Sequence, residues 1–253
     1  MLEAIHLPPN YAAKSRSLEG RVIIVTGATS GLGRAAAIAY AQAGATVVLH
    51  GRNQAKLDAV YDELEALNTP QPAIMLLDFL KATQVEIDAF AQTIEAKLGR
   101  IDGIFHGASH FSALMPLAMQ NLDIWLQHSR VNLGVPAALT KACLPMLLAA
   151  PDASVIFLTE THALTPTAYW APFAPVKNSL AALVTTWQAE LPKPCNLRFN
   201  LLHPGPVSSP FRGKTHPGEG PNAAPNVTSL CPAFLFLMGD DIVAIAAKVL
   251  QCT

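Results

Sequence analysis

The chain has 253 residues, a length that suits one large α/β domain. Hydrophobic residues make up 51% of it and charged residues only 14%, against an average of about 25% charged. The formal net charge of −1 argues against a nucleic-acid-binding surface and against attraction to anionic lipid. Because so few charges cover the surface, we expect apolar surface to be buried between subunits, in a homodimer or homotetramer.

The sequence also bears on compartment and metal binding. No apolar stretch reaches the roughly 18 residues of a membrane span, and residues 1–6 lack the features of a signal peptide. The eight histidines show no metal-ligand spacing. The cysteines are scattered without a CxxC motif, at Cys143, Cys195, Cys231 and Cys252. We therefore expect a cytoplasmic protein with reduced thiols, no membrane span and no metal site.

A glycine-rich turn is the first feature in the chain that carries chemistry. Residues 21–25 form a β-branched run of strand length, and residues 34–43 are strong helix formers followed by Gly44. On a strand-to-helix turn, free backbone N–H groups and the helix dipole bind a pyrophosphate. The alternative is a glycine-rich turn without a ligand. We assign to a dinucleotide site Gly27, Thr29, Ser30, Gly31, Leu32 and Gly33.

The remaining elements alternate between strands and helices. Further strands are predicted at 45–50, 73–77, 103–106, 154–159 and 197–202. Helices are predicted at 54–67, from a capping box at 83–86 to about 98, at 122–130, at 135–148 and at 173–190. This alternation predicts a doubly wound parallel sheet in three layers, with helices on both faces and ligands at the carboxyl ends of the strands.

The segment from about 204 to 230 breaks this pattern. Residues 204–226 contain six prolines and four glycines and show no periodicity. Because the apolar run 231–238 follows, we interpret the segment as a lid over a pocket. Plain surface disorder is the alternative. The chain is otherwise expected to be a single dinucleotide-binding domain, 1–253.

From residue 18 to residue 241 the chain resembles a classical short-chain dehydrogenase/reductase. Residues 26–33 match the TGxxxGxG cofactor turn, and Asp78 stands where the family's acidic residue meets the adenine. Asn132 matches the Asn of the catalytic tetrad, and Pro204–Gly205 matches the turn that meets the nicotinamide. The resemblance implies a Rossmann-type α/β fold, a nicotinamide cofactor and subunit pairing through the helices at 135–148 and 173–190.

The resemblance also shows a degraded catalytic tetrad. The family uses a Tyr as proton donor, a Ser that polarises the substrate oxygen, and a Lys that lowers the Tyr pKa and holds the ribose. Lys177 matches that Lys, but Phe173 stands at the Tyr position and Glu160 at the Ser position. The NNAG motif is replaced by residues 106–109, His-Gly-Ala-Ser. The family's last strand is expected to be shortened or lost.

Each departure allows more than one interpretation. Phe173 fills the volume of the missing phenol as an apolar wall, whereas Tyr169, four residues earlier, replaces that phenol if it lies on the same helix face rather than in a loop. Glu160 is either an acid with a raised pKa or an ion-pair partner of Lys177, and we favour the pair. His162 is expected to be solvated in a loop.

Cofactor choice depends on the residue after the second strand. Arg52 stands where an NAD site usually has an acidic residue, and its planar fork suits a 2′-phosphate. We therefore expect NADP(H) to be favoured over NAD(H). The predicted function is an oxidoreductase on a carbonyl/alcohol pair of unknown identity, with weak or altered catalysis. The alternative is an inactive cofactor-binding pseudoenzyme, acting as a nicotinamide sensor or partner subunit.

Overall fold

The computed structural model describes residues 2–220, 223–240 and 245–252. In that part of the chain, eight parallel strands form one sheet in the order β1-β8-β7-β6-β5-β2-β3-β4. The strands are β1 (Glu3–Ile5), β2 (Val22–Thr26), β3 (Thr46–Gly51), β4 (Ala73–Leu76), β5 (Gly103–His106), β6 (Ala153–Leu158), β7 (Leu197–His203) and β8 (Lys248–Gln251).

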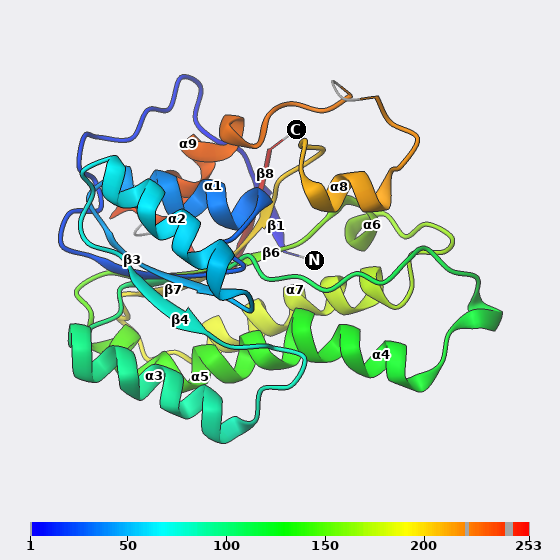
Figure 1. The fold of residues 1–253 in the computed structure, drawn as a ribbon, viewed down its shortest axis with the longest axis horizontal. Coiled ribbons are helices and arrows are strands. Elements are labelled where there is room, and N and C mark those ends of the chain that lie inside the picture. Colours follow the sequence, from blue (N-terminus) through cyan, green and yellow to red (C-terminus); the bar gives the residue numbers. More distant parts are fainter. Residues whose placement is uncertain (1, 221–222, 241–244, 253) are drawn as a thin grey trace.

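Helices cover both faces of the sheet (Figure 1). Their bounds are α1 (Gly31–Gln42), α2 (Gln54–Ala66), α3 (Gln84–Leu98), α4 (Leu122–Ser129), α5 (Val135–Ala149), α6 (Thr161–Leu164), α7 (Phe173–Glu190), α8 (Pro210–Thr215) and α9 (Cys231–Met238). Short turns of other helix types are η1 (Leu117–Met119), η2 (Arg130–Gly134) and η3 (Val227–Leu230). Helices α1, α2 and α9 pack on one face, and α3, α5 and α7 on the other. The predicted Rossmann-type, three-layer fold is therefore confirmed.

The central strands are buried because both faces are covered. Every residue of β2, β5, β6 and β7 is buried, which explains why their sequences are continuous apolar runs rather than alternating ones. The six predicted strands lie within one residue of their expected bounds. The predicted capping box is also confirmed, since Thr83 and Glu86 cap each other's backbone at the start of α3.

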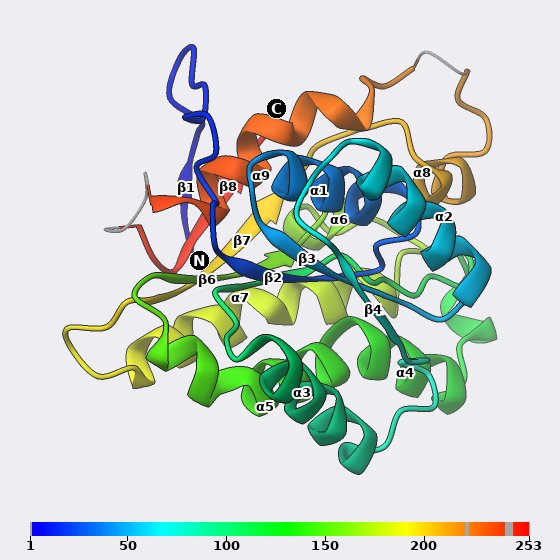
Figure 2. The ribbon, with the colours of Figure 1, turned by 60° about the vertical axis from the view of Figure 1, so that its left-hand side comes forward.

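Two strands at one edge of the sheet, β1 and β8, were not among the strands predicted from the sequence. β8 pairs with β7 on one side and with β1 on the other (Figure 2). Of the two expectations for the last strand, its loss is wrong, since four residues of it are present, and residues 3–5 extend the sheet beyond it. Asp241, which ended the expected resemblance, lies outside the described residues. Short edge strands carry too few residues to show a period in the sequence.

The two helices predicted at 122–130 and 135–148 form one continuous helix. The π turn η2 joins α4 to α5, giving a helix from Leu122 to Ala149. Contrary to the expectation from the sequence, this is the one helix in the described residues that is long and apolar enough to cross a membrane, with a mean hydropathy of 1.4 over 18 residues. Half of that window is buried inside the fold, and α5 packs against α3 and the sheet, as a core helix does.

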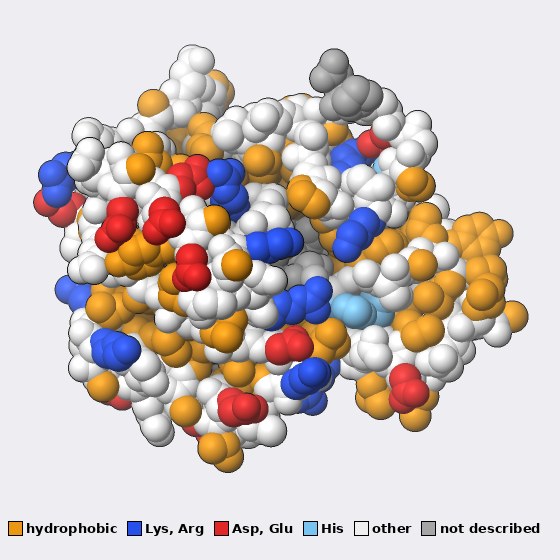
Figure 3. Space-filling model, viewed as in Figure 1, with side chains coloured by type: hydrophobic (Ala, Val, Ile, Leu, Met, Phe, Trp, Pro, Cys, Tyr) orange, Lys and Arg blue, Asp and Glu red, His pale blue; other side chains and the backbone are white. Residues whose placement is uncertain are grey.

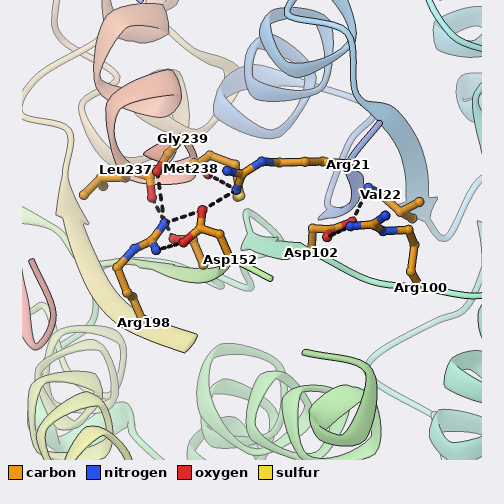
Figure 4. A network of polar contacts seen from close by, with 10 residues as sticks. Arg21, Val22, Arg100, Asp102, Asp152, Arg198, Leu237, Met238 and Gly239 are labelled. Atoms are coloured by element: carbon orange, nitrogen blue, oxygen red, sulfur yellow. Dashed lines mark hydrogen bonds and ion pairs between the residues drawn. The ribbon is translucent and has the colours of Figure 1, made fainter. Parts of the chain in front are cut away.

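A network of ion pairs and hydrogen bonds lies at the amino ends of the strands (Figure 4). Parallel sheets bind ligands at the opposite, carboxyl ends. Arg198 in β7 is 2% exposed, forms an ion pair with Asp152, and donates to the carbonyl of Gly239 at 3.0 Å. Arg21 also forms an ion pair with Asp152, at 2.6 Å, and donates to the carbonyl of Met238 at 3.1 Å. The network therefore joins the starts of β2, β6 and β7 to the end of α9.

Candidate active site

The turn between β2 and α1 has room only for glycine at two positions. Gly27 has a φ of +69°, and a Cβ there would lie 2.8 Å from the backbone of Ala108. A Cβ on Gly33 would lie 2.2 Å from the carbonyl oxygen of Gly27. Helix, strand and the segment after β5 therefore meet backbone to backbone. This places the turn at the carboxyl ends of β2 and β5, where parallel sheets bind ligands.

The start of α1 offers a place for an anion. Ser30 is its exposed N-cap, and in the described part of the chain its side chain caps no N–H group of the helix. Gly31 follows with a φ of +52°, and Thr29 and Leu32 are half-buried beside it. The first N–H groups and the positive end of the helix dipole are thus available to a ligand. These residues fit the pyrophosphate of a dinucleotide.

Other predicted cofactor residues lie along the same edge. Arg52 is exposed directly after β3, and Asp78 is half-buried after β4, where its Oδ1 accepts from the Leu80 N–H at 3.1 Å. Pro204 and Gly205 follow β7, and Gly205 turns the chain with a φ of +65°. Lys and Arg side chains gather around a hollow between the α2 and α8 sides of this face (Figure 3).

The segment after β7 lies across the start of α1. The Cβ of Ser209, at the start of α8, is 3.6 Å from the place of a Cβ on Gly31. Arg212 and Glu219 form an ion pair within the segment, with a nitrogen–oxygen distance of 2.5 Å. A cavity of about 150 Å³ opens between them and Ser208. The segment is thus irregular but contains α8 and η3, and its residues 221–222 lie outside the described part.

Asn132 holds the loop that follows β5. Its side chain is 2% exposed and lies in the π turn η2, a feature frequent at functional sites. Its Oδ1 accepts from the His110 N–H and from the Ser109 hydroxyl, each at 3.0 Å, and its Nδ2 donates to the His110 carbonyl at 2.8 Å. The amide of Asn132 therefore orients residues 109 and 110.

Lys177 and Glu160 interact through their charges, but the described residues contain no ion pair between them. Lys177 is 4% exposed, and its Nζ donates to the Leu158 carbonyl at 3.2 Å. Burial lowers the pKa of Lys177 to about 8, and the negative charge of Glu160 partly opposes this shift. Burial raises the pKa of Glu160. Hydrogen bonds from the His162 and Ala163 backbone and the charge of Lys177 lower it by a smaller amount. The favoured ion pair is therefore not formed, because Lys177 is held by a carbonyl at the end of β6.

Phe173 lies in an apolar wall, as the volume-filling interpretation expects. It is the first residue of α7 and is 2% exposed. Its ring centroid is 5.4 Å from that of Phe111, 5.4 Å from that of Phe211 and 6.4 Å from that of Trp170. Since Phe211 belongs to α8, this aromatic cluster attaches the segment after β7 to α7.

Two further sequence expectations concerned Tyr169 and His162. Tyr169 lies in the loop before α7 with a φ of +72° and is 59% exposed, so it does not share a helix face with Phe173. His162 was expected to be solvated, but it is half-buried and its ring stacks on Trp170 with centroids 3.7 Å apart. The structure thus selects the loop alternative for Tyr169, whereas the expectation for His162 is wrong, because His162 lies in the short helix α6 and packs on Trp170.

A pair of histidines beside Phe173 was not predicted from the sequence. The rings of His110 and His128 are 4.9 Å apart, and the His128 ring is 6.0 Å from that of Phe173. The Ser112 hydroxyl is 3.0 Å from His128 Nε2. The only signal was that His110 directly follows the altered 106–109 motif, whereas His128 lies 18 residues later on another element.

The chain is similar to proteins of one known family. It matches the short chain dehydrogenase family over residues 21–220. It is 33% identical over 232 residues to the uncharacterized oxidoreductase YciK of Escherichia coli (strain K12), covering 92% of this chain and 91% of that protein. A solved short chain dehydrogenase structure from Pseudomonas syringae has a TM-score of 0.93 at 35% identity, covering 96% and 98% of the two chains. Another, from Shigella flexneri and complexed with NADP, has a TM-score of 0.90 at 32% identity, covering 94% and 99%.

Proposed function

The chain belongs to the short-chain dehydrogenase/reductase family of oxidoreductases, and we propose that it binds NADP(H) as one domain, 1–253, with weak or altered catalysis on a carbonyl/alcohol pair. The observation that carries the proposal is the glycine turn, where Gly27 and Gly33 leave no room for a Cβ and α1 starts uncapped by Ser30 in the described residues. The NADP in the Shigella flexneri structure supports the choice of cofactor.

Each residue has a role in this proposal. Gly27, Thr29, Ser30, Gly31, Leu32 and Gly33 hold the pyrophosphate. Arg52 meets the 2′-phosphate, Asp78 the adenine, Lys177 the ribose, and Pro204 and Gly205 the nicotinamide. The bound cofactor supplies or accepts a hydride. The segment 204–230 is the lid that covers the site, and the close approach of Ser209 to Gly31 supports this.

Catalysis is the step that this site performs poorly. The Phe173 ring has no proton to donate, and Glu160 offers a carboxylate where the family has a hydroxyl. Loss of a positioned general acid lowers the rate by a factor on the order of 10²–10⁴. We expect calorimetry to detect tight NADPH binding, and a panel of ketones, aldehydes and quinones to show little turnover at neutral pH. Absence of NADPH binding would refute the proposed function.

A second candidate, an inactive sensor or partner subunit, is favoured by the packing of Phe173. Its ring lies within the aromatic cluster with 2% exposure, so the position of the missing acid is occupied by apolar contacts. Tight NADPH binding with no turnover on the panel at any pH would support this candidate. A pull-down that recovers an active relative would then favour the partner subunit over the sensor.

Replacing Arg52 with Asp tests the proposed cofactor preference. Arg52 is exposed after β3 and free to approach a 2′-phosphate, and a hydrogen bond between ionised groups contributes about 1.5–3 kcal/mol. NADPH affinity should therefore fall about 10- to 100-fold, while NADH affinity should not fall. Calorimetry with both cofactors measures this, with Lys56→Asp, an exposed cation at the start of α2, as the matched control. An unchanged preference for NADPH over NADH in Arg52→Asp would mean that Arg52 is a surface residue that does not bind the 2′-phosphate.

We also propose a cytoplasmic homodimer or homotetramer. Large apolar side chains stand exposed on and before α4, with Leu117 83%, Leu122 71% and Leu126 56% exposed. Exposed apolar surface of this kind is common where subunits meet. Light scattering at micromolar protein should give a mass of at least two subunits. A monomeric mass would contradict the proposal.

A further inference from the structure

We propose that His110, supported by His128 and Ser112, is the proton donor that replaces the missing phenol of this site. The proposal rests on the proposed function, because it assigns the acid for the carbonyl reduction described above.

His110 lies close to the position of the missing phenol, because its ring packs on His128, whose ring centroid is 6.0 Å from that of Phe173. It follows the carboxyl end of β5, and Asn132 binds both its backbone N–H and its carbonyl. The ring centroid of its neighbour Phe111 is 5.4 Å from that of Phe173. The charges of Arg52, after β3, and of Lys214, on α8, both act on the His110 ring. His110 therefore lies between the proposed 2′-phosphate site and the lid, within range of the charges of both.

Both rings keep an unused polar atom. His110 Nε2 and His128 Nδ1 are buried and have no hydrogen-bond partner among the described residues. A buried imidazole nitrogen without a partner is costly unless a ligand or a solvent molecule completes it. A substrate oxygen at His110 Nε2 supplies such a partner. No comparable atom is available at position 173, where the side chain is a phenyl ring.

The histidine pair approaches solvent through Ser112. Ser112 is exposed and its hydroxyl is 3.0 Å from His128 Nε2. The His128 ring is in turn 4.9 Å from the His110 ring. Hydroxyl and imidazole groups both donate and accept protons. Ser112 and His128 are thus positioning and relay residues, and His110 is the residue that touches the substrate.

The proton that the reduction consumes is supplied by His110 and replaced from water. As the hydride reaches the carbonyl carbon, the C=O π pair moves to the oxygen, which takes the proton from protonated His110. The imidazolium becomes a neutral imidazole, and water returns a proton to it through Ser112 and His128. One hydride and one proton are consumed for each carbonyl converted to an alcohol.

The proposal predicts how the rate depends on pH. Burial, followed by the charges of Arg52 and Lys214, lowers the pKa of His110, and a hydrogen bond with the Gln127 side chain partly opposes this shift. Burial also lowers the pKa of His128 to about 4, and the charge of His110 adds to that shift. His110 is therefore mostly neutral at about pH 8, and its protonated fraction grows about ten-fold for each unit by which the pH falls, until its pKa is reached. The value of kcat/KM should rise in the same proportion.

The test uses NADPH-dependent reduction of para-nitroacetophenone by the full-length chain from about pH 8 down to about pH 5.5, corrected for cofactor decay. We expect the acid-side rise in the unmodified protein and in His6→Gln, an exposed histidine near the N-terminus. His110→Gln should abolish the rise and lower kcat/KM about ten-fold or more at the acid end. His128→Gln should lower kcat more than it changes KM. Imidazole added to His110→Ala should restore turnover.

A second measurement is independent of turnover. Histidine ring NMR on the NADP⁺ complex should show His110 titrating below its ordinary range, with a signal that shifts in His128→Gln. A pH-independent rate, unchanged kinetics in His110→Gln, or no turnover at any pH despite NADPH binding would overturn the assignment and leave cofactor binding standing. Failure of NADPH to bind in calorimetry would instead overturn the proposed function.

Discussion

Replacing Phe173 with Tyr and Glu160 with Ser together should raise NADPH-dependent ketone reduction on the order of 10²–10⁴-fold at about pH 8. Lys177 is already in place to serve the new phenol, since its Nζ lies 5.8 Å from the centroid of the Phe173 ring. Burial lowers the pKa of Lys177 to about 8, so an ammonium is present for part of the titration range to stabilise a phenolate. Steady-state kcat/KM against para-nitroacetophenone measures the gain.

The single variants are the controls for this prediction. Phe173→Tyr alone should gain less, because the Glu160 carboxylate raises the pKa of a neighbouring phenol by like-charge repulsion. Glu160→Ser alone should gain little, because it restores no acid. If the unmodified protein turns over briskly and Glu160→Gln abolishes this, Glu160 is the working acid. A double variant that stays inert while binding NADPH would mean that the pocket itself no longer accepts a carbonyl.

Replacing Asp152 with Ala should lower the free energy of unfolding by about 3–5 kcal/mol, because removing one partner leaves buried charge uncompensated. Arg198 is 2% exposed and Arg21 is 13% exposed, and both bind this carboxylate. The variant leaves two guanidinium groups facing each other at the amino edge of the sheet. Urea unfolding with a common m-value measures the loss. Asp152→Asn, which keeps hydrogen bonding, should lose about 1–3 kcal/mol.

The control for this variant is an exposed pair. In Arg16–Glu19 the side chains are 64% and 59% exposed, so Glu19→Ala should change stability by no more than about 0.5 kcal/mol. The pH dependence gives a second check. Burial raises the pKa of Asp152, but its bonds to Arg198 and Arg21 outweigh this and the net shift is downward. Its contribution should therefore be present above the ordinary Asp pKa of about 3.9 and be lost as the pH falls through the lower folded value. A loss below about 1 kcal/mol in Asp152→Ala would contradict the prediction.

Local sequence was sufficient for the framework of the fold and for the cofactor edge. The apolar runs that became β2, β5, β6 and β7 are long enough to identify without partners, and the capping box at Thr83 begins α3 through contacts three residues apart. The turn at residues 26–33 was predictable because strand, glycines and helix are contiguous. Family resemblance then located Asn132 and Lys177, because each lies in a short contiguous motif that can be matched without knowledge of the tertiary structure.

Tertiary structure decided everything that depends on segments distant in the chain. The pairing of β1 with β8 joins the two ends of the chain, and no period within three or four residues announces it. Lys177 binds the Leu158 carbonyl rather than Glu160 because the end of β6, not charge alone, sets the nearest acceptor. His110 and His128 meet only because Asn132 fixes one loop against the α4–α5 helix. Such contacts follow from packing between elements, whereas sequence patterns report only the faces of each element.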